Sequence, residues 1–143
     1  MVVEHSDDDR SISLDAINDP RVIEGVRLFN EQEYFACHDV FEEIWSEIID
    51  DRRELYQGLI HTAVALFHFS EGNLGGARKM HDSAVGYLTP FRERSTGFDL
   101  GRLLDDFTSC FAELLAAREY PAGLAIPVDR IPLIHLTRED EQQ

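Results

Sequence analysis

The sequence predicts an all-α fold: an antiparallel helical bundle of about five helices with an extended C-terminal arm. Three observations lead to this fold class. Apolar residues recur at helical spacing in several segments, and residues that cap helices precede those segments. Three of the five prolines lie after residue 120, where they prevent further helix. Since 43% of the 143 residues are hydrophobic, the chain can bury one core.

The first expected helix follows an acidic segment. Residues 1–18 are rich in aspartate, and we expect them to form a mobile, solvated lead-in. Asp19 and Pro20 then begin a helix that ends near Asn30, because the carboxylate can cap the helix and proline suits its first position.

A second helix is expected over about residues 31–49. At 100° per residue, Asp39 and Glu43 fall on its polar face, opposite a wide apolar arc. His38 and Glu42 fall within that arc. We therefore expect both of these side chains to point inward.

A third helix opens at Asp50 and Asp51, whose charges suit a helix N-terminus, and runs to about Glu71. This segment is apolar around most of its circumference, which predicts a central position in the bundle. Its polar residues fall within about 60° of one another. They are Glu54, Gln57, His61 and His68.

Gly72 and Asn73 predict a tight corner before a fourth helix, since a glycine C-cap is followed at once by an asparagine N-cap. A loop is expected over residues 89–98 and a fifth helix over about residues 99–118. The proline-containing arm then docks on the bundle through Ile131, Leu133, Ile134 and Leu136. The expected divisions are the lead-in (1–18), a bundle domain (19–120) and the arm with its tail (121–143).

The charge balance excludes some classes of partner. The chain carries 28 acidic and 13 basic side chains, which gives a net charge of −15. Such an excess of acids is typical of adaptation to a salt-rich cytosol, where salt screens the repulsion between them. The charge argues against nucleic acid and anionic membranes as ligands, because both require a basic surface.

Other features favour a cytoplasmic protein. No apolar run approaches the ~18 residues that span a bilayer, and the N-terminus lacks the basic and then apolar pattern of a signal peptide. Cys37 and Cys110 lie far apart within expected helices, so we interpret them as buried, reduced thiols.

Polar residues within these apolar helices define a candidate pocket. Its members are His38, Glu42, Trp45, Gln57, His61, His68 and Asn73. Because a buried polar group is costly unless it has a partner, such residues indicate either an internal network or a binding site. If the second and third helices pack antiparallel, His38 and Glu42 can face Gln57 and His61.

Three interpretations of this cluster stay open. In the first, Glu42 orients His38, the other polar groups complete a structural network, and Trp45 anchors the core. In the second, His38, Glu42 and His61 bind a divalent metal such as zinc at a hydrolase-like site, with Gln57 orienting water or substrate. In the third, the His38 and Glu42 pair performs metal-free acid–base catalysis.

Two histidines are expected to be structural. His68 is about 10.5 Å along the helix axis from His61, too far to share one ion, and suits a helix C-terminus. His81 falls within an apolar stripe and is interpreted as a core histidine with satisfied hydrogen bonds.

The runs Phe29–Trp45 and Gln57–Ala77 resemble the DUF309 family, a small all-α domain of bacteria and archaea whose function is not established. The resemblance covers about residues 22–90. The residues at the motif positions of the family are His38, Glu42, Trp45, Gln57, Gly58, His68, Gly72, Asn73 and Ala77. The resemblance implies the fold and no reaction.

These observations favour a cytoplasmic, non-catalytic helical module that binds a small molecule or a protein through the polar cluster between the second and third helices. The metal-dependent hydrolase and the metal-free acid–base enzyme are the two alternatives. The sequence does not indicate an oligomeric state.

Overall fold

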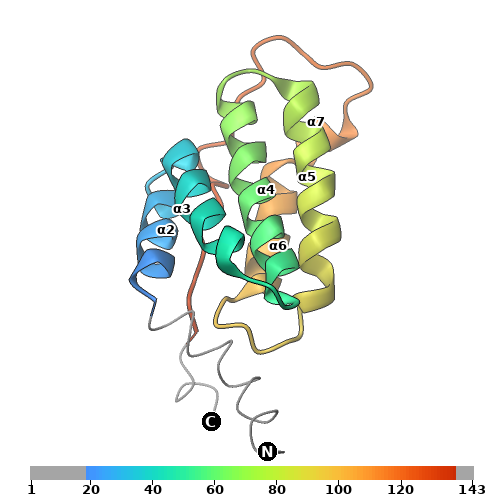
Figure 1. Ribbon diagram of the computed structural model, residues 1–143. Helices are drawn as coiled ribbons and strands as arrows, with labels where there is room; N and C mark the ends of the chain where they lie inside the picture. Colours follow the sequence, from blue (N-terminus) through green and yellow to red (C-terminus); the bar gives the residue numbers. More distant parts are fainter. Residues whose placement is uncertain (1–18, 138–143) are drawn as a thin grey trace, which may run out of the picture.

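The computed structural model describes residues 19–137 and confirms the all-α fold (Figure 1). The described helices, in chain order, are α2 (Pro20–Asn30), α3 (Tyr34–Glu47), α4 (Arg52–Ser70), α5 (Leu74–Leu88), the 3-10 helix η1 (Thr89–Phe91), α6 (Leu100–Cys110) and α7 (Ala112–Ala116). Within the described part, the only β interaction is an isolated bridge between Phe98 and Leu136. The expected lead-in and the last six residues lie outside the described range.

Helix α4 is the centre of the bundle. It packs against α3 on one side and α5 on the other, while α2 packs against α3. Figure 1 shows α6 behind α4 and α5, on the side away from the viewer. Leu59, Ala63 and Leu66 of α4 are fully buried, as the apolar circumference of this segment predicts. The front surfaces of α3, α4 and α5 therefore form one continuous face.

Two predicted helices differ from the observed ones. The second helix begins at Tyr34 instead of residue 31, because residues 31–33 form the corner between α2 and α3. The predicted fifth helix is divided into α6 and α7 at Phe111, whose side chain is fully buried. The Phe111 ring packs against the rings of Phe107 and Phe69, with centroids 4.8 Å and 5.0 Å away. The break thus occurs where the chain buries an aromatic side chain against two helices.

The α2–α3 and α4–α5 corners have the same structure, 40 residues apart. The amide of Glu33 donates to the carbonyl of Leu28 at 2.8 Å, and the amide of Asn73 donates to the carbonyl of His68 at 2.9 Å. Gln32 and Gly72 occupy the left-handed region at φ 64° and 79°. Because glutamine is uncommon in this region, the sequence signals only the second corner.

The C-terminal arm docks through fewer residues than predicted. Ile134 is buried, and its amide and carbonyl are both hydrogen-bonded by the Asn30 side chain, at 2.8 Å and 3.0 Å. Leu133 is 38% exposed, so its predicted docking is wrong. Leu136 also packs on the core, and the backbone on either side of it is hydrogen-bonded to the loop before α6 through Asp99 and Gly97, so the arm is held at more than one position.

Two helical glycines should respond oppositely to the same substitution. A Cβ on Gly58 would lie 2.6 Å from Leu88 Cδ2 and 3.0 Å from Tyr87 Cβ, whereas a Cβ on Gly86 meets nothing within 4 Å. Gly58→Ala should therefore lower the free energy of unfolding by about 1–3 kcal/mol. Gly86→Ala should raise it by about 0.5–1 kcal/mol, since alanine is the better helix former. Urea unfolding of the two variants checks this, and a stabilised Gly58→Ala would show that α4 and α5 are less closely packed.

Candidate functional site

His38 lies on α3 between two carboxylates. Its Nε2 atom is 3.3 Å from Glu42 Oε2, and its Nδ1 atom is 3.1 Å from Asp39 Oδ1. The His38 side chain is 23% exposed, but that of Glu42 is 56% exposed. The prediction that Glu42 points inward is therefore wrong. The Glu42 side chain extends to the helix surface, where its carboxylate contacts water.

His61 connects α4 to α5 instead of α3. The side-chain amide of Gln57 donates to His61 Nε2 at 2.7 Å, and His61 Nδ1 lies 2.7 Å from Ser83 Oγ on α5. An amide nitrogen is a donor only, so Nε2 must accept and Nδ1 carries the proton that it donates to Ser83. Burial lowers the pKa of His61, and the nearby charge of His38 lowers it further. His61 is thus a neutral bridge between two helices.

The expected cluster is consequently divided into two parts. His38 and Glu42 form one pair on α3, and Gln57 and His61 form a bridge with Ser83. The two histidines are close enough to affect each other electrostatically, although no hydrogen bond joins them. Ser83 was not predicted as a member of the pocket, because the serine lies in no sequence motif that indicates a role.

The three predicted metal ligands do not fit one ion. Within residues 19–137, no group of three or more His, Cys, Asp or Glu side chains is placed to hold a metal. Both ring nitrogens of His61 already have partners, Gln57 and Ser83. His61 would have to break at least one of these hydrogen bonds to join His38 and Glu42 as a ligand.

Trp45 contacts a cation at the other end of α3. The guanidinium carbon of Arg53 lies 3.8 Å from the centre of the Trp45 ring system. The ring is partly buried and packs on the core, in agreement with its expected anchoring role. Trp45 is not among the residues that line the hollow beside His38.

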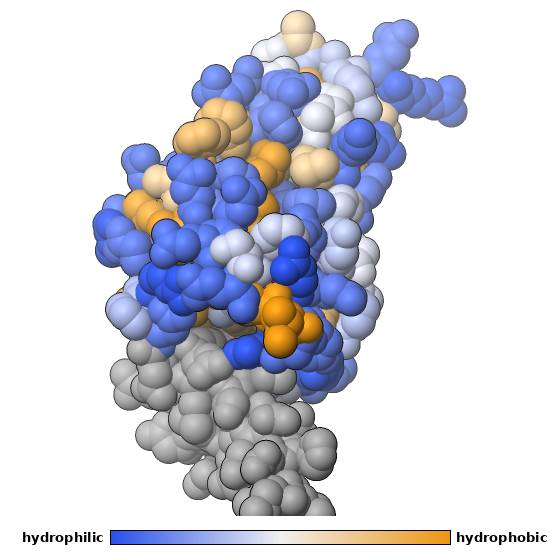
Figure 2. Space-filling view, viewed as in Figure 1, coloured by the Kyte–Doolittle hydropathy of each residue, from blue (hydrophilic) through white to orange (hydrophobic). Residues whose placement is uncertain are grey.

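His38 and His68 meet at an apolar hollow between α3 and α4, which we call the α3–α4 hollow. Its volume is about 170 Å³, and its lining residues are Tyr34, Phe35, His38, Val64, Phe67 and His68. Phe35 is 59% exposed, and its ring centroid lies 5.8 Å from that of His38 and 5.5 Å from that of Phe67. Figure 2 shows, in the same view as Figure 1, apolar surfaces lying among hydrophilic side chains.

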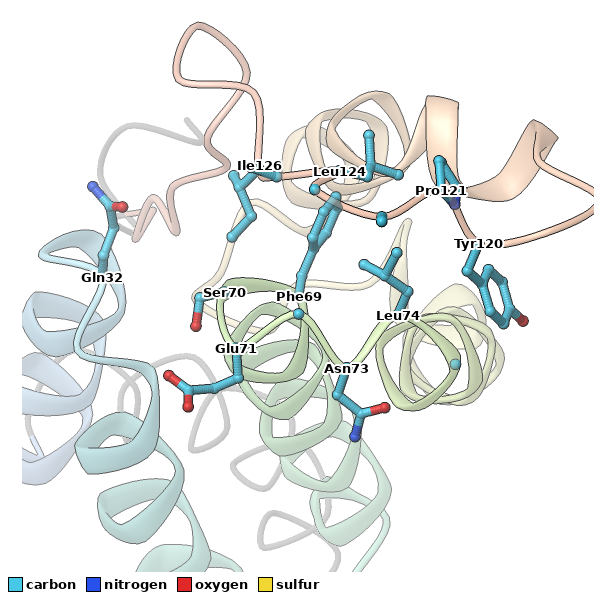
Figure 3. Close-up of a pocket in the computed structure, with 15 residues that line it drawn as sticks. Gln32, Phe69, Ser70, Glu71, Asn73, Leu74, Tyr120, Pro121, Leu124 and Ile126 are labelled. Atoms are coloured by element: carbon cyan, nitrogen blue, oxygen red, sulfur yellow. The ribbon is translucent and has the colours of Figure 1, made fainter.

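A larger hollow lies at the α4–α5 corner and contains Asn73 (Figure 3). Its volume is about 790 Å³, and it is bounded by residues 69–75 and 120–126 together with Gln32. Asn73 caps α5 by accepting a hydrogen bond from the Gly76 amide at 3.1 Å, and its Nδ2 atom lies 3.3 Å from His68 Nδ1. Glu71 is the only charged residue in this lining, so the corner hollow has few groups that could act in catalysis or bind a charged ligand.

His81 lies on the side of α5 that faces the core. It is 4% exposed and lies between the rings of Phe107 and Phe111, with centroid distances of 4.6 Å and 4.8 Å. Its Nδ1 atom lies 3.1 Å from Asp82 Oδ1, but Nε2 is buried and has no hydrogen-bond partner within residues 19–137. The burial of His81 is as predicted, whereas the prediction that its hydrogen bonds are satisfied is wrong for this atom.

Cys37 and Cys110 are free and buried, as predicted. Burial raises the pKa of the Cys37 thiol well above its usual range and that of Cys110 to about 11. Both thiols are therefore protonated at neutral pH and poorly nucleophilic.

Comparison with known proteins confirms the family resemblance for one part of the chain. Residues 22–80 match the DUF309 family. The family is described as a domain of unknown function, and the DUF309 segment includes most of α2, all of α3 and α4, and the first half of α5. It therefore contains the α3–α4 hollow and both members of the His38–Glu42 pair.

Two proteins that resemble the chain are uncharacterised. The chain is 30% identical over 100 residues to the uncharacterized protein YpuF of Bacillus subtilis, an alignment that covers 68% of this chain and 57% of YpuF. It is 26% identical over 76 residues to an uncharacterized protein of Aquifex aeolicus, covering 52% of this chain and 23% of that protein. The chain thus spans less than two thirds of either relative. No solved structure matches it.

Within residues 19–137, no helix is long and apolar enough to cross a membrane.

Proposed function

We propose that this chain is a non-catalytic interaction module of the cytoplasm, whose α3–α4 hollow receives one apolar side chain of a partner protein. The observation that carries the proposal is the exposure of Phe35, 59%, whose side chain lines an apolar hollow. A large aromatic side chain left in water next to a concave apolar surface is typical of an interaction site. The buried free thiols of Cys37 and Cys110 support a reducing compartment.

The size of the hollow favours a side chain over a substrate or cofactor. Pockets for small molecules usually measure about 300–1,000 Å³. The α3–α4 hollow, about 170 Å³, is smaller than this range. It suits a single leucine, isoleucine or phenylalanine side chain presented by another protein.

The hydrogen bonds of the polar residues support a structural role for His61. Its two ring nitrogens bind Gln57 and Ser83, so neither is directed toward a free ligand. Ser83 lies within α5, where backbone N–H groups are used by the helix. Acyl transfer needs such donors to stabilise an oxyanion, so this serine and histidine pair lacks a principal component of a hydrolase site.

Binding of a side-chain analogue tests the proposal. N-acetyl-leucine methylamide, titrated into the labelled protein at millimolar concentration, should shift the NMR signals of Val64 and Phe67. Phe35→Ala should abolish these shifts, because it removes one wall of the hollow. Ile49→Ala is the matched control, since Ile49 is 97% exposed and lies outside the hollow. Shifts confined to the corner hollow, or equal effects of the two variants, would overturn the proposal.

A further inference from the structure

We infer that the partner segment that fills the α3–α4 hollow is a basic amphipathic helix, with an apolar residue in the hollow and a lysine or arginine at Asp39 and Glu42. This inference rests on the proposed function and adds the chemistry of the partner. Three features carry it: a pair of exposed carboxylates that pair with no lysine or arginine of the described residues, the distribution of arginines on the same hairpin, and the shape of the surface.

The two carboxylates beside His38 offer more acceptors than His38 can fill. The imidazole of His38 has at most two N–H groups, one toward Asp39 and one toward Glu42, whereas the two carboxylates have four oxygen atoms that can accept hydrogen bonds. Within the described range, neither carboxylate has a lysine or arginine at ion-pair distance. Both are more than half exposed, 63% and 56%. A cation from a partner can therefore reach them without displacing a lysine or arginine of this chain.

Five other acids of the same hairpin already have an arginine partner. Arg21 pairs with Asp19, Glu43 and Glu47, and Arg27 pairs with Glu24 and Glu31. Neither arginine is among the residues that line the α3–α4 hollow. The charge that remains open to a partner on α3 is thus concentrated beside His38, which itself lines the hollow.

The shape of this surface suits a helix. The hollow lies between two helices, and within the described residues no sheet offers an edge to which an extended peptide could add a strand. An amphipathic helix binds such a groove through its apolar face. Its basic residues would then lie beside Asp39 and Glu42, and a cation there can also contact the exposed Phe35 ring. The net charge of −15 steers a basic partner toward the protein at low ionic strength.

Designed peptides test the inference. Three fluorescent helical peptides share one leucine face and carry lysine, glutamine or glutamate at the remaining positions. Anisotropy titrations are made at low and at high NaCl, with circular dichroism confirming that the protein is folded at each salt concentration. We expect the lysine peptide to bind most tightly, and its affinity to fall as salt rises.

Variants distinguish the site from general acidity. Asp39→Asn with Glu42→Gln should weaken the lysine peptide about five- to tenfold, the range expected for two exposed ion pairs. Glu93→Gln with Glu119→Gln removes the same charge elsewhere and should change affinity less than twofold. Equal losses in the two double variants, or no preference for lysine, would overturn the inference. If the lysine and glutamine peptides bind equally and both need Phe35, the inference fails while the proposed function stands. If the leucine analogue also fails to bind, both fall.

Discussion

Replacing Phe111 by alanine is expected to lower the free energy of unfolding by about 3–5 kcal/mol, the cost of removing a fully buried phenylalanine. The Phe111 ring contacts Phe69 of α4, His81 of α5 and Phe107 of α6, so its loss leaves a cavity where three helices meet. Urea unfolding at constant salt measures the effect.

Phe35→Ala is the matched control for Phe111→Ala. The same atoms are removed from a side chain that is 59% exposed, so the free energy of unfolding should change by about 0.5 kcal/mol or less. Phe35→Ala should nevertheless lose the binding of the leucine analogue. A destabilisation of Phe35→Ala close to that of Phe111→Ala would make Phe35 a core residue and remove the main support for an interaction surface.

Acid is expected to destabilise the protein partly through His81. Burial between aromatic rings lowers the pKa of His81 from its ordinary value of 6.5, and this effect outweighs the opposing one of Asp82. The unfolded chain therefore takes up a proton near pH 6.5, which the folded protein binds only at lower pH. Stability from this source is present above pH 6.5 and is lost as the pH falls toward the folded pKa. The loss between pH 7.5 and 5.5 should be up to about 1.4 kcal/mol.

His81→Leu isolates this contribution from that of the carboxylates. Leucine has a similar volume and cannot be protonated, so the variant should lose less stability than the wild-type protein over the same pH interval. The Nε2 atom of His81 has no partner within residues 19–137, so the variant removes no hydrogen bond at that atom. The difference in the free energy of unfolding between the wild-type protein and the variant should therefore change with pH. A difference that stays constant from pH 7.5 to 5.5 would contradict the prediction, because it would mean that folding does not change the pKa of His81.

The helices could be predicted where capping residues mark their ends. Asp19 caps α2 by accepting from the Arg21 amide, and Asn73 caps α5 by accepting from the Gly76 amide. The corner at Gln32 has no such signal, because its left-handed backbone is imposed by the surrounding structure on a residue that does not favour it. The break at Phe111 could not be predicted either, because the apolar stripe continues through this residue and only tertiary packing divides the helix.

The candidate site could be predicted only in part. Helical spacing correctly paired His38 with Glu42 and Gln57 with His61, because these are contacts within one turn of a helix. Spacing does not specify how one helix is rotated against the next, and in the structure His61 turns toward Ser83 instead of α3. The α3–α4 hollow could not be predicted for the same reason. Its walls, Phe35 and Phe67, come from two helices, and helical spacing does not specify which residues of one helix contact the other.

Intermolecular NOEs in the complex with the lysine peptide test the central claim most directly. The leucine methyl groups of the peptide should show NOEs to Val64 and to the Phe35 ring, which line the α3–α4 hollow. The peptide lysines should at the same time perturb the signals of Asp39 and Glu42. NOEs to Leu74 and Ile126 of the corner hollow, with none to Val64 or Phe35, would contradict the assignment of the α3–α4 hollow as the binding surface.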